Sequence, residues 1–380
     1  MDVSRLADRM LKGRFPTGVD RVGLAYLQYF GVRARAVVRF AGRWVVLSES
    51  DTRRVFAALL GTVAAPAKVL RRCVARGYAL SWRQYHEALF LNTVHSGLCQ
   101  PGYAEEIVQR NLQPVFFLHD LIPITHPEYC RPGEAEKHHR RLAVMLSLGR
   151  GIVVNSAATR DELIAYALRH DYALPPCVIA PLAPGHVLLP SLSRPLDAPY
   201  FVVLGTIEPR KNHLLLLNIW RELVQTLGEA APKLVVIGQR GWECEQVVDM
   251  LERCEAIGGV VLEKSVCEDH ELATWLRHAQ ALLFPSFAEG FGMPLIEALM
   301  LGVPVIASDL PVFHEIAGDI PEYLDVLDGV GWKRMILAYA VPNSEAAQAQ
   351  KRRMQGYAAP TWAQHFVVVE SLLASFEEVV

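Results

Sequence analysis

One stretch decides the fold: Phe284-Pro-Ser-Phe-Ala-Glu289-Gly-Phe-Gly292-Met-Pro294-Leu-Ile-Glu297-Ala-Leu-Met300. An apolar run ends at Phe284, a turn with two glycines follows, and Pro294 suits the first position of a helix. A strand, a glycine-containing turn and a helix form the unit that parallel α/β sheets repeat. The stretch therefore predicts a strand whose turn leads directly into a helix N-terminus.

The turn of this unit offers groups that bind anions and hydroxyls. Backbone amides at a helix N-terminus attract a phosphate, and Gly290 and Gly292 leave them uncovered. Glu289 lies in the turn itself. Glu297, about one turn inside the helix, can accept hydrogen bonds from two vicinal hydroxyls of a ribose. For either glutamate alone, complementing the helix dipole is the ordinary alternative.

Working outward, apolar β-branched runs alternate with amphipathic segments throughout the 380 residues. This alternation is typical of α/β proteins with parallel sheets, and the length favours two domains. In the second half we expect strands at Phe201–Gly205, Leu234–Gly238, Val260–Glu263, Ala281–Pro285 and Val303–Ala307. In the first half we expect strands at Arg33–Phe40, Ala88–Thr93, Val115–His119, Gly151–Asn155 and Cys177–Pro181, and helices at Asp20–Tyr29, Glu134–Leu148 and Ala157–Arg169.

The predicted organisation is two doubly wound Rossmann-like units in tandem. Residues 1–182 form the first domain, the proline-rich residues 183–199 the linker, and residues 200–360 the second domain. Residues 361–380 form a closing helix that can pack back on the first domain. No apolar strand precedes the amphipathic Ser4–Leu11, so either an opening strand is missing or the first sheet begins differently.

Composition excludes several classes of protein. With 52% hydrophobic and 21% charged residues, the chain is globular rather than disordered. The net charge of −2 by itself indicates no affinity for nucleic acid. That total combines an excess of Lys and Arg in residues 1–190 with an excess of Asp and Glu in residues 191–380. The scattered cysteines and the lack of a signal peptide favour a cytoplasmic protein, and five prolines between Tyr172 and Ser193 exclude a membrane span there.

Three further motifs carry candidate chemistry. The segment Gly205-Thr-Ile-Glu208-Pro-Arg210-Lys211-Asn212 places two cations between a strand and a helix, which suits a diphosphate, although such pairs are often merely solvated. His119 follows a buried strand, at the edge where open α/β sheets bind ligands, although an isolated histidine there is commonly structural. The turn around Gly18 leads into a helix, so its backbone amides could bind an anion. The alternative is an ordinary helix start that is capped by Thr17 or Asp20.

Together these motifs resemble glycosyltransferase family 4, whose members transfer sugars from nucleotide donors with retention and adopt the two-Rossmann GT-B fold. Glu289 and Glu297 have the spacing of that family's E-x7-E signature. The Gly205–Asn212 segment is similar to its donor-diphosphate motif. His119-Asp-Leu with Pro127-Glu-Tyr129 is similar to its mannosyltransferase-like branch, and Thr17-Gly18-Val-Asp-Arg to its amino-terminal glycine loop. Several relatives have an arginine directly after the first glycine of the diphosphate motif, where this chain has Thr206.

The resemblance implies roles for these residues. Lys211 and Arg210 would hold the diphosphate, Glu297 the ribose, and Glu289 the transferred sugar, together with the amides of Gly290, Phe291, Gly292 and Met293. Gly205, Ser265 and Val266 complete the expected donor-binding residues of the second domain. From the first domain, His119 would contact the sugar and the Gly18 loop the diphosphate or the acceptor.

The chain contains no Asp-x-Asp motif, the usual carboxylate clamp for a divalent metal on a nucleotide sugar. We therefore expect no metal and no cofactor besides the donor, with Arg210, Lys211 and helix amides stabilising the leaving diphosphate. A GDP-linked hexose such as GDP-mannose is the first choice of donor, and UDP- or dTDP-sugars are alternatives. The expected acceptor is a bacterial polysaccharide or its lipid-diphosphate-linked precursor.

The alternatives to a transferase are an epimerase or phosphorylase of the same fold and an inactive sugar-nucleotide-binding subunit. Intact Glu289, Glu297, Lys211 and His119 argue against the inactive subunit. The basic first 83 residues also favour peripheral docking on an anionic inner-membrane surface.

Overall fold

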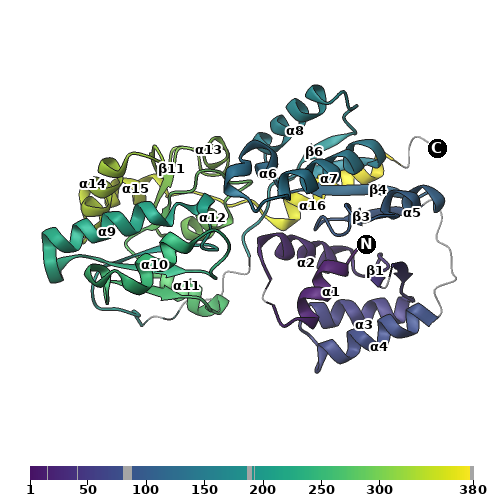
Figure 1. Cartoon of the computed structure of the whole chain (residues 1–380), viewed down its shortest axis with the longest axis horizontal. Coiled ribbons are helices and arrows are strands. Elements are labelled where there is room, and N and C mark those ends of the chain that lie inside the picture. Colours follow the sequence, from purple (N-terminus) through teal and green to yellow (C-terminus); the bar gives the residue numbers. More distant parts are fainter. Residues whose placement is uncertain (15, 41, 80–87, 186–190, 192, 377–380) are drawn as a thin grey trace. The chain divides into compact units, whose positions relative to one another are not determined.

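The structure is a computed structural model that describes residues 1–14, 16–40, 42–79, 88–185, 191 and 193–376. The chain forms two compact units (Figure 1). Unit 1 consists of Met1–Leu121, Glu136–Leu182 and Trp362–Val380, and unit 2 of Ile122–Ala135 and Ala183–Thr361.

This division differs from the sequence-based one, since unit 2 already begins at Ala183, within the predicted linker. Residues 122–135 were expected in the first domain, yet they pack with unit 2. Residues 186–190 and 192 of the predicted linker and residues 377–380 of the predicted closing helix lie outside the described residues.

Unit 2 is built on a six-stranded parallel sheet with the order β9-β8-β7-β10-β11-β12. The strands are β7 (Tyr200–Leu204), β8 (Lys233–Ile237), β9 (Val261–Lys264), β10 (Leu282–Phe284), β11 (Val305–Ser308) and β12 (Glu322–Leu324). Counted along the chain within the unit, this is the Rossmann order 3-2-1-4-5-6. The order reverses between β7 and β10, and open α/β sheets bind ligands at the carboxyl ends of the strands that meet at such a point.

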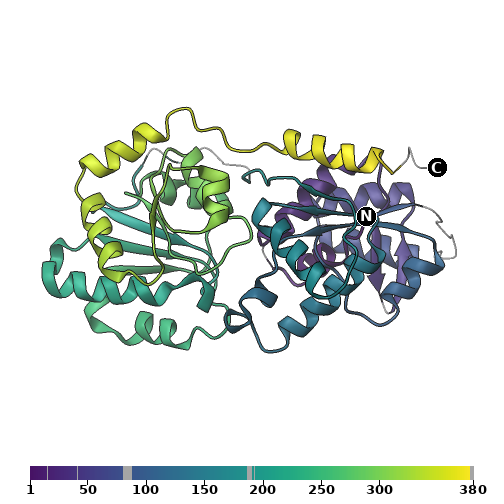
Figure 2. The ribbon, with the colours of Figure 1, turned by 90° about the horizontal axis from the view of Figure 1, so that it is seen from above.

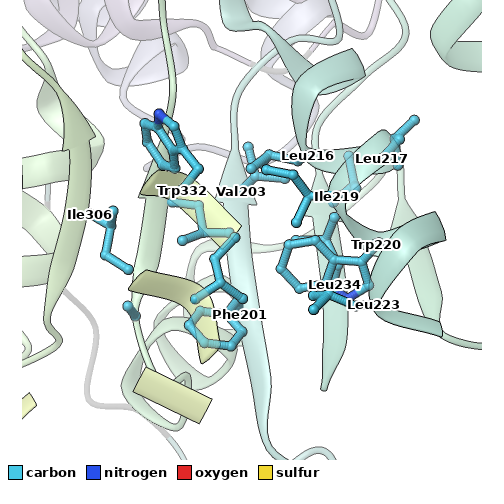
Figure 3. Packing of buried hydrophobic residues seen from close by; sticks show 14 of the residues in the cluster. Phe201, Val203, Leu216, Leu217, Ile219, Trp220, Leu223, Leu234, Ile306 and Trp332 are labelled. Atoms are coloured by element: carbon cyan, nitrogen blue, oxygen red, sulfur yellow. The ribbon is translucent and has the colours of Figure 1, made fainter. Parts of the chain in front are cut away.

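Helices cover both faces of this sheet (Figure 2). They are α9 (His213–Leu227), α10 (Glu245–Arg253), α11 (Asp269–Arg277), α12 (Met293–Met300), α13 (Pro311–Ala317), α14 (Gly329–Ala340) and α15 (Glu345–Arg353). On one face, Phe201 and Val203 of β7 pack in a buried cluster with Trp220 of α9 and Trp332 of α14 (Figure 3). Tyr200, which precedes Phe201 and therefore faces the other side of the sheet, meets Trp275 of α11 edge-on. β7 is therefore buried on both faces, which fixes the position of the turn that follows it.

Unit 1 contains a parallel sheet of β3 (Leu89–Asn92), β4 (Gln113–Leu118), β5 (Gly151–Val154) and β6 (Cys177–Ile179). A separate antiparallel pair consists of β1 (Val37–Phe40) and β2 (Arg43–Val46). Residues 1–3 link the two, because Asp2 N donates to Leu91 O while Val3 N donates to Val37 O. A short segment that bonds to both β-structures thus precedes α1, where the sequence pattern indicated no strand.

The helices of unit 1 include one from the end of the chain. They are α1 (Ser4–Leu11), α2 (Gly18–Phe30), α3 (Glu49–Leu59), α4 (Pro66–Ala79), α5 (Tyr103–Gln109), α7 (Glu134–Leu148), α8 (Ala157–Arg169) and α16 (Trp362–Ala374). In α16, the ring of Phe366 stacks on Tyr29 of α2 with centroids 3.9 Å apart. The imidazole of His365 hydrogen-bonds to Pro181 O and to the Tyr26 hydroxyl. The chain therefore returns to unit 1 after completing unit 2.

Candidate functional site

The turns after β7 and β10 meet at the point where the sheet order of unit 2 reverses. After β7, the chain passes Gly205 (φ 144°) and forms a short 3-10 turn, η2 (Pro209–Lys211). Asn212 then adopts the left-handed conformation, and α9 begins at the next residue. A Cβ on Gly205 would lie 3.1 Å from Cε of Lys211. The glycine therefore makes room for the lysine side chain to lie back over the end of the strand.

Lys211 is buried, with its ammonium 5.0 Å from the centroid of the Phe284 ring. Its Nζ lies 2.5 Å from Oε1 of Glu289. Burial lowers the pKa of Lys211, and the ion pair with Glu289 opposes that effect. The two residues predicted for the diphosphate and the sugar are thus paired with each other in this structure.

Arg210 binds the second oxygen of the same carboxylate, with Nη1 at 2.8 Å from Oε2 of Glu289. Burial alone would raise the pKa of Glu289, but Arg210 and Lys211 outweigh it and hold the pKa at about 2. Glu289 is therefore ionised at any physiological pH, and both of its oxygens face a cation.

A second carboxylate orients Arg210 from the other side. Nη2 of Arg210 lies 2.6 Å from Oε1 of Glu208, which is buried. Two hydrogen bonds tie the turns together: the side-chain Nη1 of Arg210 donates to Ala288 O at 2.7 Å, and the backbone Phe287 N donates to Arg210 O at 2.9 Å. The ion-pair cluster Glu208, Arg210, Lys211 and Glu289 has a formal charge of zero, because two cations face two carboxylates.

The helix after β10, α12, begins shortly after Glu289 in the sequence. Gly292 (φ 107°) is the residue before α12, and a Cβ there would lie 2.7 Å from the Phe313 ring. Pro294 is the second residue of α12, one place later than expected. Glu297 is buried on this helix, and its Oε1 accepts a hydrogen bond from Gly185 N at 3.3 Å. The predicted strand, turn and helix are all present, with both glutamates on the carboxyl side of β10.

Other predicted residues are not members of the ion-pair cluster. Ser265 and Val266 are exposed and follow β9, which is separated from β7 by β8. His119 and Gly18 belong to unit 1. Gly18 opens α2 behind a capping box, in which Thr17 N donates to the Asp20 carboxylate at 2.8 Å. This turn is therefore a capped helix start, as the second interpretation of the Gly18 motif predicted.

His119 is buried at the end of β4, and its Nε2 donates to Thr93 O at 2.8 Å. Burial lowers the pKa of His119 to about 4, so the imidazole is neutral at physiological pH. Its ring centroid lies 5.2 Å from that of His95, a non-glycine residue with a positive φ of 55°.

Sequence reasoning missed two parts of the site. Glu208 stands inside the quoted Gly205–Asn212 segment but was given no role, although a carboxylate two residues from an arginine is a usable signal. Tyr129 was placed in the first domain with its strand-end segment, yet its ring stacks on Phe287 of unit 2. No local pattern indicates that packing, because it joins residues far apart in the sequence.

Among the residues that the structure describes, no group of three or more His, Cys, Asp or Glu side chains is placed to hold a metal ion. Within the same residues, no helix has the length and apolar character needed to cross a membrane.

Comparison with protein families matches residues 189–320 to the model named Glycosyl transferases group 1. The matched range contains the ion-pair cluster and the start of α12. It covers β7 to β11 of unit 2 and none of the strands of unit 1.

Curated relatives match part of the chain. The serotype-specific mannosyltransferase WbdA of Escherichia coli is 28% identical over 218 residues, which is 53% of this chain and 26% of WbdA. The O-antigen chain mannosyltransferase B of Escherichia coli is 31% identical over 216 residues, 53% of this chain and 54% of that protein. D-inositol 3-phosphate glycosyltransferase of Frankia alni is 28% identical and covers 67% of this chain and 70% of that protein. The chain thus spans about a quarter of WbdA and about half of mannosyltransferase B.

Solved structures share the fold. Alr3699/HepE of Anabaena, solved in complex with UDP, has a TM-score of 0.68 at 13% identity and covers 95% of this chain and 97% of that one. Sucrose-phosphate synthase of Thermosynechococcus elongatus has a TM-score of 0.59 at 18% identity, covering 83% and 79%. These likenesses show the α/β fold of two Rossmann-like units known as GT-B, as the sequence predicted.

Proposed function

We propose that this chain is a retaining glycosyltransferase of family 4 that moves a hexosyl group from a nucleotide sugar to a saccharide acceptor. The observation that carries the proposal is the ion-pair cluster at the reversal point of the unit 2 sheet. The buried Lys211 and the half-buried Arg210 are held there by carboxylates, and Arg210 also by the carbonyl oxygen of Ala288, shortly before the start of α12 in the chain. Such a site suits the diphosphate of a sugar nucleotide.

The chemistry follows from where charge develops. When the bond between the sugar carbon and the leaving phosphate oxygen breaks, negative charge accumulates on that phosphate. Arg210 and Lys211 lie at the carboxyl end of β7, so they are placed to stabilise this charge. Glu289 must then exchange its two cations for hydroxyls of the sugar, while Glu297 holds the ribose. We assign Glu289 to positioning the sugar, because hydrogen bonds from the sugar hydroxyls would occupy its oxygens once the donor is bound.

We further propose that the reaction needs no metal ion. The cations that neutralise the diphosphate are supplied by Arg210 and Lys211, in place of a metal held by an Asp-x-Asp clamp. Turnover in excess EDTA should equal turnover with added Mg²⁺ or Mn²⁺. A dependence on either metal that EDTA abolishes would contradict this part of the proposal.

GDP-mannose or a related GDP-hexose is the proposed donor, with a polysaccharide or lipid-linked saccharide of bacterial surface glycan synthesis as acceptor. The two Escherichia coli mannosyltransferases named above support this choice. UDP- and dTDP-sugars are the alternative donors, and HepE in complex with UDP supports the first of them.

We propose a cytoplasmic chain that docks on anionic membrane through its basic first 83 residues. At low ionic strength, sedimentation with anionic vesicles should exceed sedimentation with neutral vesicles. Equal partitioning would remove the membrane from the proposal.

The test of the function is turnover of a panel of GDP-, UDP- and dTDP-sugars by the wild type and by Lys211→Ala. We expect one donor to react and Lys211→Ala to lose on the order of 100-fold or more of the rate, as is typical when a charge-stabilising donor is removed. Lys333→Ala is the matched control, because Lys333 of α14 forms a surface ion pair with Glu222 of α9. Full activity of a folded Lys211→Ala would contradict the assignment of Lys211 to the diphosphate. A wild type that binds nucleotide but shows no turnover would favour the inactive sugar-nucleotide-binding subunit.

A further inference from the structure

Residues 122–135 leave unit 1 after β4 and return to it in α7, and between these points they pack with unit 2. They contain a short helix, α6 (Ile122–Thr125), and a 3-10 turn, η1 (Pro127–Tyr129). This segment belongs by sequence to the first half of the chain, but its contacts are with the turns that follow the unit 2 strands.

Tyr129 is the central contact of the segment. Its ring stacks on Phe287, with centroids 4.8 Å apart and planes inclined by 16°. Its carbonyl oxygen accepts a hydrogen bond from Nε1 of Trp242 at 3.4 Å, and the guanidinium of Arg131 lies 5.0 Å from the Trp242 ring. Phe287 is in the turn after β10 and Trp242 in the turn after β8. The segment therefore touches the turns on both sides of the one after β7.

The Phe287 contact leads directly to the ion-pair cluster. Phe287 N donates to Arg210 O, and the next residue, Ala288, accepts from the Arg210 side chain through its carbonyl oxygen. Glu289 follows immediately. A shift of the Phe287 ring would therefore move the backbone that carries the Glu289 carboxylate and loosen the bonds that orient Arg210.

The Trp242 contact restrains the neighbouring turn. Gly241 N donates to Ile207 O at 2.9 Å, and a Cβ on Gly241 would lie 2.7 Å from Cγ2 of Thr206. The backbone beside Trp242 is thus packed against the Gly205–Asn212 segment itself. Tyr129 and Arg131 contact this turn through Trp242, and Tyr129 contacts the turn after β10 through Phe287.

We infer that Tyr129 is a positioning residue of the donor site, which fixes the Phe287 turn so that Glu289, Arg210 and Lys211 keep their mutual geometry. The inference rests on the proposed function and assigns part of the donor site to the first half of the chain. An aromatic pair of this kind corresponds to about a twofold to tenfold effect on an equilibrium.

The test compares the donor affinity and turnover of Tyr129→Ala, Tyr129→Leu and Tyr129→Phe. Tyr129→Ala and Tyr129→Leu should weaken binding of the reactive nucleotide sugar by about twofold to tenfold, with a smaller change in kcat than in KM. Tyr129→Phe should restore wild-type values, because the ring and not the hydroxyl makes the stack. Tyr129→Leu preserves apolar volume, so it keeps the test available if the alanine variant folds poorly. Glu128→Gln is the control, because Glu128 is exposed in the same turn.

A double-mutant cycle separates positioning from general stabilisation. If Tyr129 acts through Phe287, the donor affinity of Tyr129→Ala combined with Phe287→Ala should match that of Phe287→Ala alone. Additive losses, or wild-type affinity in a folded Tyr129→Ala, would overturn the inference while leaving the proposed function intact. A wild type that binds no nucleotide sugar would overturn both.

Discussion

Glu289 holds the two residues that a diphosphate would need. Its oxygens lie 2.5 Å from Nζ of Lys211 and 2.8 Å from Nη1 of Arg210, and the cluster is neutral once Glu208 is included. A diphosphate that enters must compete with Glu289 for these cations. In a sugar nucleotide, hydrogen bonds from the sugar hydroxyls can replace the ion pairs that Glu289 loses. A nucleoside diphosphate has no sugar group to replace them.

This competition gives a prediction for Glu289→Gln. The variant should bind the nucleoside diphosphate product about fivefold or more tightly than the wild type, since a close charge pair in a partly buried site is worth on the order of 1 kcal/mol or more. Its turnover of the nucleotide sugar should fall. Isothermal titration with GDP and UDP measures the first effect, and Glu222→Gln, which alters a surface pair, is the control. Weaker product binding by Glu289→Gln would show that Glu289 does not compete with the diphosphate.

At the scale of elements, local patterns predicted most of the strands and helices. The helices Glu134–Leu148 and Ala157–Arg169 have the predicted bounds, and each strand predicted in the second half overlaps an observed one. Only Val37–Phe40 of the predicted Arg33–Phe40 is a strand. In α12 and the turn before it, spacing located both glutamates because strand, turn and helix are consecutive in the sequence.

Long-range packing could not be predicted in the same way. The ion pairs between the turns after β7 and β10 join residues 78 or 79 positions apart, and the stack of Tyr129 on Phe287 joins residues still farther apart. The sequence indicated that both turns lie at the carboxyl edge of the sheet. It did not indicate that Glu289 would pair with both cations.

Two glycines at helix starts should respond differently to the same change. Gly292→Ala places a Cβ 2.7 Å from the Phe313 ring at a φ of 107°, whereas Gly18→Ala has open space at the first residue of α2. We expect Gly292→Ala to lower the free energy of unfolding by about 1–3 kcal/mol and Gly18→Ala to leave it nearly unchanged. Urea denaturation of both variants checks this. A stable Gly18→Ala with reduced turnover would support a ligand contact at Gly18. A stable Gly292→Ala would show that a Cβ at position 292 does not clash with the Phe313 ring.

For the whole molecule, α16 makes the stability of unit 1 depend on the last part of the chain. Burial lowers the pKa of His365 to about 4, while the bonds to Pro181 and Ala180 oppose this effect only in part. An unfolded histidine takes up its proton near pH 6.5, so the unfolded state binds more protons between pH 6.5 and pH 4. Neutral His365 therefore makes its full contribution to the free energy of unfolding above pH 6.5, and this contribution is lost as the pH falls towards 4.

We accordingly expect unit 1 to lose up to about 3 kcal/mol of stability from this residue between pH 6.5 and pH 4. His365→Gln, which can still donate to Pro181 O and accept from the Tyr26 hydroxyl, should show a shallower dependence on pH. Denaturant titrations at several pH values measure both slopes, with His170→Gln at an exposed position as control. Identical slopes in wild type and His365→Gln would contradict this account of how α16 is anchored.

The proposed function requires that a nucleoside diphosphate binds in unit 2, where the strand order reverses between β7 and β10. A crystal structure with the nucleoside diphosphate of the reactive donor tests it most directly. We predict diphosphate oxygens within hydrogen-bond distance of Lys211 and Arg210, ribose hydroxyls on Glu297, and Glu289 released from at least one cation. A diphosphate bound elsewhere, with the Glu289 ion pairs unchanged, would contradict the account.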